Sequence, residues 1–277
     1  GIPVTADMYT YVAGATGLDA SMPTWVQAGG YDKWAERLRD PDIRARVKAE
    51  MAVNADDWEN LGYLAGPDGL VLVDFKNEEL KAKYMGKTVA GVAAERGQDY
   101  RDTIIDLVIE DGSRVGTVYF LMSEEHVKKQ IRRPWVMFGS DADAPAAEGE
   151  ALEEGAHPRT YGNVARLLGK YVRDEQVITL QEAVRRLTSL PAETLNIRSR
   201  GRLAPGYFAD IAIFDAKAIA DHATFDDPHQ YSSGVMHVLV NGVPVVSEGK
   251  HTGATPGRAV RGPGWDRGNG ASRSGAD

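Results

Sequence analysis

A continuous apolar run at residues 135–138, Trp-Val-Met-Phe, ends abruptly in the Gly-Ser-Asp of residues 139–141 and constrains the fold more than any other feature. An uninterrupted run of this length is typical of a parallel strand that is covered on both faces. Strand and helix patterns alternate along the rest of the chain. Together these features predict an α/β fold in which Asp141 lies at the carboxyl end of a buried strand.

Composition narrows the possible classes of protein. The 277 residues, 43% of them hydrophobic, suffice for one large domain or two modest ones. The net charge of −8, with scattered basic residues, argues against nucleic-acid and membrane partners. The absence of cysteine excludes disulfides and a thiolate metal site in this chain. The sequence does not identify the compartment, although the cytoplasm is slightly favoured. The first residues resemble the interior of a longer protein sequence.

Local signals predict further elements. Helices are expected to begin after four N-cap residues: Asp40, Thr88, Ser123 and Thr179. Thr179 belongs to a capping box. Strands are expected over residues 2–11, 70–75 and 114–122, and Gly14 and Gly17 predict a loop after the first of these. Residues 143–155 are expected to form a mobile loop, because they are rich in Ala, Glu and Pro.

The periodicity changes from helix to strand beyond Pro191. Strands are predicted over residues 211–214, 236–240 and 243–246, and Asn241-Gly242 predicts a type I′ hairpin turn between the last two. This part of the chain is therefore expected to form a separate β layer. Residues 262–277 hold almost nothing to bury, which predicts a disordered tail.

Asp141 is the sharpest candidate for catalysis. A carboxylate at the carboxyl end of a buried parallel strand lies where α/β barrels place their active sites. Such an aspartate is also common as a helix N-cap or in a loop, and position alone does not separate these roles. Asp143 lies further into the loop and is the weaker candidate for the same role.

The histidines offer no local metal site, since none are spaced as His-x-His or His-x-x-x-His: His126, His157, His222, His229, His237 and His251. His157 precedes Arg159, which could present a cation to a carboxylate-bearing substrate, because a guanidinium matches carboxylate geometry. Anchoring of the loop is the equal alternative. Tyr9, Tyr119 and Met122 lie near strand ends, where each either contacts a substrate or simply packs.

Several segments together resemble the N-acyl-D-amino-acid deacylases, the D-aminoacylase group of the amidohydrolase superfamily. The resemblance runs from the first residue to about Arg261. It rests on residues 5–14 (Thr-Ala-Asp-Met-Tyr-Thr-Tyr-Val-Ala-Gly), 92–97 (Val-Ala-Ala-Glu-Arg-Gly), 139–141 (Gly-Ser-Asp), 157–159 (His-Pro-Arg), 188–192 (Thr-Ser-Leu-Pro-Ala) and 206–210 (Gly-Tyr-Phe-Ala-Asp).

The resemblance implies the C-terminal part of a TIM-like barrel with an α/β insertion, plus part of a small β-sandwich domain. Residues 1–11 would be barrel strand seven, 12–123 the insertion, 124–198 strand eight with the following helices, and 199–261 the β domain. The family's zinc ligands come from earlier strands, so the chain is expected to be truncated and inactive alone. The absence of metal-ligand spacing among the histidines agrees with this expectation.

The family's chemistry implies roles for five residues. Asp141 would be the catalytic proton shuttle and a zinc ligand, with the other ligands upstream, while Tyr9, Tyr119, Met122 and Arg159 would bind substrate. The implied reaction is zinc-dependent hydrolysis of N-acyl-D-amino acids, which are small molecules. Dihydroorotase-like or hydantoinase-like ring opening and a non-catalytic fragment are the alternatives. Ala142 and Ala15 depart from the family pattern, which leaves the acyl-amino-acid preference open.

Overall fold

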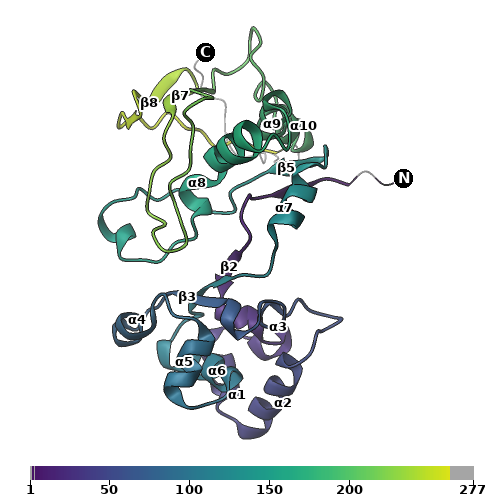
Figure 1. Ribbon diagram of the computed structural model, residues 1–277, viewed down its shortest axis with the longest axis vertical. Helices are drawn as coiled ribbons and strands as arrows, with labels where there is room; N and C mark the ends of the chain where they lie inside the picture. Colours follow the sequence, from purple (N-terminus) through teal and green to yellow (C-terminus); the bar gives the residue numbers. More distant parts are fainter. Residues whose placement is uncertain (1, 3, 263–277) are drawn as a thin grey trace, which may run out of the picture.

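The computed structural model describes residues 2 and 4–262, which form a mixed α/β structure of two lobes (Figure 1). One lobe is built from the segment between β2 and β4, and the other from β1 and the chain that follows β4. Each lobe has its own apolar core. The predicted tail lies outside the described residues except for Gly262. No helix in the described part of the chain combines the length and apolarity that crossing a membrane requires.

The first lobe, lower in Figure 1, consists of one antiparallel sheet covered by helices. Its strand order is β2-β4-β3, formed by β2 (Gly14–Gly17), β4 (Gly116–Tyr119) and β3 (Leu70–Asp74). The helices are α1 (Tyr31–Leu38), α2 (Pro41–Met51), α3 (Leu61–Ala65), α4 (Glu78–Tyr84), α5 (Val89–Arg96) and α6 (Tyr100–Asp111). The expected caps are confirmed, because Asp40 and Thr88 accept backbone N–H groups of α2 and α5.

The prediction of a loop at Gly14 and Gly17 was wrong, because these residues begin and end β2. The glycine at position 17 serves close packing rather than a turn. A Cβ atom there would lie 2.7 Å from the Cβ of Arg114, and Arg114 pairs with Asp19 at 2.8 Å. Glycine therefore allows β2 to lie against the Arg114 side chain beside β4.

The second lobe contains the predicted parallel strand. β5 (Val136–Phe138) pairs in parallel with β1 (Ala6–Met8), and Asp7 lies opposite Met137. The helices are α7 (Glu124–Ile131), α8 (Arg159–Arg166) with a π-helical extension over Leu167–Asp174, α9 (Leu180–Leu187) and α10 (Ser189–Thr194). Within the described residues these two strands form a separate sheet and not a closed barrel. The Ser123 and Thr179 caps are confirmed.

A four-stranded antiparallel sheet follows, formed by β6 (Ile211–Phe214), β7 (Val235–Val240), β8 (Val243–Ser247) and β9 (Lys250–His251). Asn241 and Gly242 have φ angles of 51° and 81°, which confirms the predicted hairpin turn. The described residues of this part form a single sheet, without the second sheet that a β-sandwich requires.

Candidate active site

The candidate site lies at the carboxyl edge of the β1–β5 sheet. Parallel pairing brings the carboxyl ends of both strands together, and the Gly139 N–H donates to the Met8 carbonyl at 3.1 Å. Tyr9 follows β1 directly, and Asp141 lies three residues beyond β5. Asp141 has a φ of 50°, a left-handed conformation that aspartate tolerates better than most residues. Its side chain is 67% exposed and available to a ligand.

Arg159 joins Asp141 to Tyr9. A guanidinium nitrogen of Arg159 lies 2.9 Å from a carboxylate oxygen of Asp141, and the guanidinium carbon lies 4.5 Å from the centre of the Tyr9 ring. The Arg159 side chain is only 8% exposed, so its position is fixed by its surroundings. The structure thus brings together three of the five residues that the sequence singled out. Burial raises the pKa of Tyr9, which keeps its phenol protonated and able to donate a hydrogen bond.

His157 holds this cluster in place. Its Nδ1 accepts the backbone N–H of Arg159 at 3.0 Å, so Nε2 carries the proton and donates to the Ala13 carbonyl at 2.8 Å. Burial lowers the pKa of His157 to about 4, and the positive charge of Arg159 acts in the same direction. His157 therefore anchors this part of the chain, and the guanidinium of Arg159 lies beside Asp141.

Asn163 is a positioning residue that the sequence did not reveal. Its Oδ1 accepts the Thr10 N–H at 2.8 Å, and its Nδ2 donates to the Gly139 carbonyl at 2.8 Å. One amide therefore ties together the chain after β1 and the chain after β5. Its position four residues after Arg159, on the same helix face, is the signal that could have identified it.

The structure does not bring Tyr119 and Met122 to this cluster. Tyr119 is fully buried in the core of the first lobe, and its hydroxyl donates to the Gly17 carbonyl at 2.8 Å. Met122 lies in the segment between β4 and α7, where its N–H donates to the Val12 carbonyl at 3.0 Å. The surroundings of Tyr119 indicate a structural residue rather than a substrate-binding one.

Replacing Tyr119 by phenylalanine should lower the free energy of unfolding by about 1 kcal/mol, because the partly buried Gly17 carbonyl loses its phenol partner. Urea denaturation would measure the loss. The Tyr63→Phe variant is the control, because Tyr63 is 46% exposed. A Tyr119→Phe protein of unchanged stability and weakened ligand binding would contradict the structural role.

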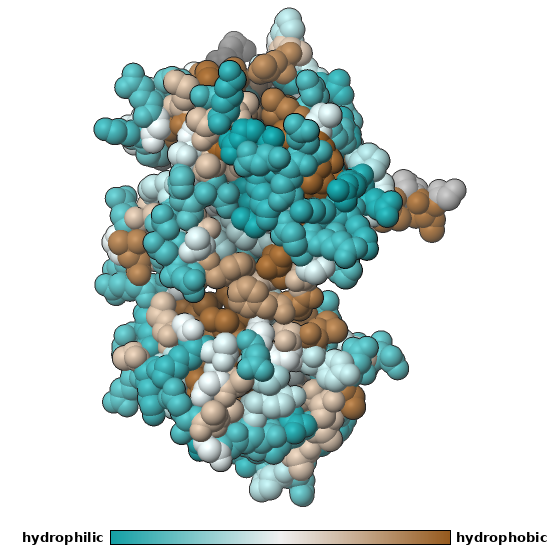
Figure 2. Space-filling view, viewed as in Figure 1, coloured by the Kyte–Doolittle hydropathy of each residue, from teal (hydrophilic) through white to brown (hydrophobic). Residues whose placement is uncertain are grey.

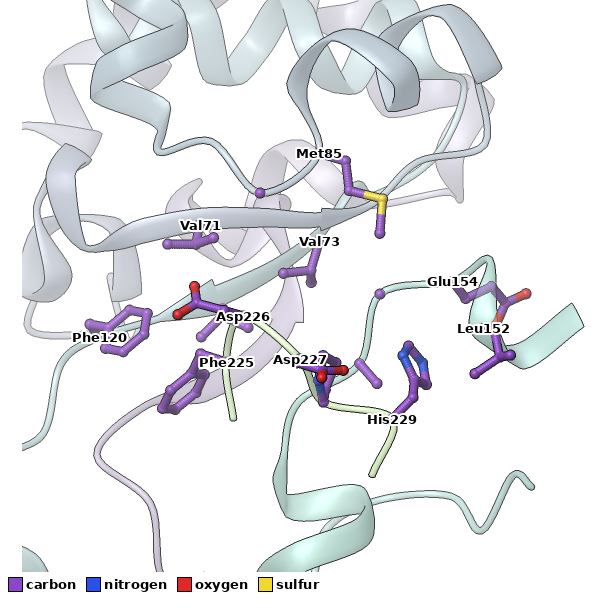
Figure 3. Close-up of a pocket in the computed structure, with 15 residues that line it drawn as sticks. Val71, Val73, Met85, Phe120, Leu152, Glu154, Phe225, Asp226, Asp227 and His229 are labelled. Atoms are coloured by element: carbon purple, nitrogen blue, oxygen red, sulfur yellow. The ribbon is translucent and has the colours of Figure 1, made fainter. Parts of the chain in front are cut away.

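Two neighbouring cavities open beside the cluster. The smaller, of about 270 Å³, is lined by Asp141, Arg159, His157, Tyr161 and Ala15 among others. The larger, of about 430 Å³, lies between the sheet of the first lobe and the loop at residues 225–229 (Figure 3). The cavities share lining residues at positions 154–156 and 229. A ligand at Asp141 therefore has space that continues toward the first lobe.

The described residues do not form a metal site. Among them, no three His, Cys, Asp or Glu side chains lie close enough together to hold an ion. The carboxylate of Asp141, the one expected ligand, pairs with Arg159. This cluster can orient an anion and transfer a proton, but it does not supply a coordination sphere.

Sequence comparison relates the chain to known hydrolases. Residues 112–246 match the profile described as "Amidohydrolase family". A D-aminoacylase of Alcaligenes xylosoxydans xylosoxydans is 37% identical over 175 residues, which cover 63% of this chain and 34% of that protein. An N-acyl-D-glutamate deacylase of the same organism is 37% identical over 176 residues, which cover 64% of this chain and 33% of that protein. The chain thus spans about a third of the length of these relatives.

Solved structures give the same relationship. A crystal structure of a D-aminoacylase aligns with a TM-score of 0.65 and 28% identity, covering 90% of this chain and 41% of that one. An N-acyl-D-glutamate deacylase from Bordetella bronchiseptica was solved in complex with zinc and a phosphonate inhibitor. It aligns with a TM-score of 0.62 and 29% identity, and the alignment covers 88% of this chain and 40% of that one. By sequence and by fold, this chain is similar to amidohydrolases, and the proteins that it resembles include D-aminoacylases and N-acyl-D-glutamate deacylases.

Proposed function

We propose that this chain supplies a proton-transfer group and a substrate-binding group to an enzyme that hydrolyses N-acyl-D-amino acids to a carboxylate and a free D-amino acid. The observation that carries the proposal is the Asp141–Arg159 pair, which lies at the carboxyl edge of a parallel strand pair and lines a cavity. The names of the matched relatives support this class of substrate. The parallel pairing of β1 and β5 supports their assignment as barrel strands seven and eight, with residues 12–123 as an insertion.

Zinc is the metal that we expect in this enzyme, since one structural relative was solved with zinc. Because no three potential ligands among the described residues lie together, this chain would contribute Asp141 and the other ligands would come from outside these residues. When bound, zinc would polarise the amide carbonyl and acidify water. This chain contributes two groups besides the metal chemistry. Asp141 carries the proton, and Arg159 holds the carboxylate of the substrate.

Asp141 is suited to move a proton. Its exposed carboxylate lines the smaller cavity and forms an ion pair with one guanidinium nitrogen of Arg159. A carboxylate within reach of the attacking water accepts a proton, and the resulting acid returns it to the leaving amine nitrogen. In the unliganded chain, Arg159 holds this carboxylate in position.

Arg159 is suited to hold the carboxylate of the substrate. It carries five N–H donors in a planar fork, one of which lies on Asp141. Replacing it by methionine should weaken binding of N-acetyl-D-leucine by about 10- to 100-fold, because a charge-assisted hydrogen bond is lost. Isothermal titration calorimetry measures this effect. Arg159→Lys should restore it only in part, since lysine lacks the fork.

The matched control for that experiment is Arg202→Met, because Arg202 is an exposed arginine that also pairs with a carboxylate, that of Glu193. Its affinity for N-acetyl-D-leucine should equal that of the wild type. Equal losses in both variants would show that Arg159 acts through general electrostatics or folding and not by contact with the ligand.

A substrate panel tests the function itself. The zinc-loaded enzyme that contains this chain should release free amino acid from N-acyl-D-amino acids and leave the L-enantiomers intact. Release is measured by an amine-reactive reagent. Turnover of cyclic ureides, with no activity on any N-acyl-D-amino acid, would contradict the proposal and favour ring opening.

A further inference from the structure

The sheet of the first lobe has an apolar face that its own core does not use. Leu70, Leu72 and Tyr119 face the core. Because side chains alternate along a strand, Val71 and Val73 of β3 and Val118 of β4 face the other way, where they line the larger cavity. An antiparallel sheet that covers a core on one face usually carries polar residues on the other. The apolar second face here therefore requires an explanation.

This face leads directly to Asp141. Ala15 of β2 pairs with Val118 of β4, and Val118 pairs with Val71 of β3. Ala15 lines the cavity beside Asp141, whereas Val118 and Val71 line the larger one. A row of three apolar side chains thus connects the two cavities across the sheet.

The aromatic ring of Phe225 forms the opposite wall. The Phe225 ring lies 4.7 Å from that of Phe120 and 5.1 Å from that of His157, the residue that anchors Arg159. Figure 3 shows Val71 and Val73 on one side of the cavity and Phe225 on the other. On the surface, apolar residues gather at the waist between the two lobes (Figure 2). The groove therefore begins at the candidate site and runs between the lobes.

The charges in the groove have one sign. Carboxylates of Glu154, Asp226 and Asp227 line the larger cavity, and no lysine or arginine is among its described lining residues. A second carboxylate on a substrate would be repelled there and would lose hydration without gaining a cation. An uncharged apolar group would instead bury its surface against the valines and phenylalanines.

We propose that this groove, defined by the residues that line the larger cavity, selects N-acyl amino acids by their amino-acid side chain. The side chain lies in the groove beyond Arg159, and the groove favours one that is uncharged and apolar. N-acyl derivatives of glutamate and aspartate are disfavoured. The inference rests on the proposed function and adds to it a substrate class within the N-acyl amino acids.

The test is a binding panel on the wild-type chain, measured by isothermal titration calorimetry with N-acetyl derivatives of D-leucine, D-phenylalanine, D-glutamate and D-aspartate. The two apolar compounds should bind at least tenfold more tightly than the two acidic ones. Equal binding of all four compounds would overturn the groove inference and leave the proposed function standing. Failure of every compound to bind would overturn both.

A charge placed in the groove tests its location. Val73→Arg should tighten binding of N-acetyl-D-glutamate, relative to N-acetyl-D-leucine, by about tenfold or more, since a charge-assisted hydrogen bond becomes available. Val243→Arg is the matched control, because Val243 is a strand valine, 42% exposed, outside the groove. An unchanged ratio in Val73→Arg, or an equal change in both variants, would overturn the assignment.

Discussion

Replacing Asp141 by asparagine is expected to lower the hydrolysis rate of N-acyl-D-amino acids by a factor of about 10²–10⁴, the usual contribution of a positioned acid–base group. Asparagine has nearly the same shape and also tolerates the φ of 50° found at this position, so the fold should be retained. What is lost is the ability to accept and return a proton. The measurement is kcat of the zinc-loaded enzyme that contains this chain.

The same substitution should strengthen ligand binding although it lowers the hydrolysis rate. In the wild-type chain, Asp141 competes with a ligand carboxylate for Arg159. Asparagine carries no charge, so N-acetyl-D-leucine should bind about two- to fivefold more tightly, the range expected for an exposed ion pair. A structural defect would weaken binding and catalysis together, which separates the two explanations.

Asp143→Asn is the matched control. Asp143 lines the same cavity two residues further along, but the described residues show no ion pair between it and Arg159. Its replacement should leave kcat within about twofold. A large loss of rate in Asp143→Asn with little change in Asp141→Asn would reverse the assignment of the proton-transfer group.

Features encoded by neighbouring residues were predictable from the sequence. The caps at Asp40, Thr88 and Thr179 depend on hydrogen bonds that span two or three residues, and all three are confirmed. The apolar run before Asp141 predicted a parallel strand, and the pairing of β5 confirms it. The expected cover on both faces is incomplete, because Trp135 is 46% exposed and Met137 is half-buried. The neighbourhood of Asp141 and Arg159 followed from the family resemblance rather than from spacing.

Features that depend on distant contacts were not predictable. Gly14 and Gly17 suggested a loop, but they form a strand because residues about 100 positions later pair with them. Tyr119 lies near a strand end, yet the register of β4 directs it into the core. Its neighbour Val118 faces the groove instead. A shift of one residue in the predicted strand exchanges these two roles, and the sequence alone does not fix that register.

Acidification should destabilise the chain through His157. The side chain is 5% exposed, and burial lowers its pKa in the folded state from 6.5 to about 4. Between these two pH values the unfolded chain binds a proton that the folded chain does not bind. The free energy of unfolding therefore decreases as the pH falls from about 6.5 to about 4, and is unaffected by this group above that range.

The expected loss from His157 is about 3 kcal/mol between pH 7 and pH 4, which is most of the effect of its lowered pKa. Urea denaturation at these two pH values measures the total change, to which the carboxylates also contribute. His157→Gln removes the titrating group and should show a pH-dependent loss smaller by about this amount. His126→Gln is the control, because His126 is exposed, and it should follow the wild type. If His157→Gln also follows the wild type, His157 does not remain neutral in the folded chain, and the hydrogen bond that its Nδ1 accepts from Arg159 is absent in solution.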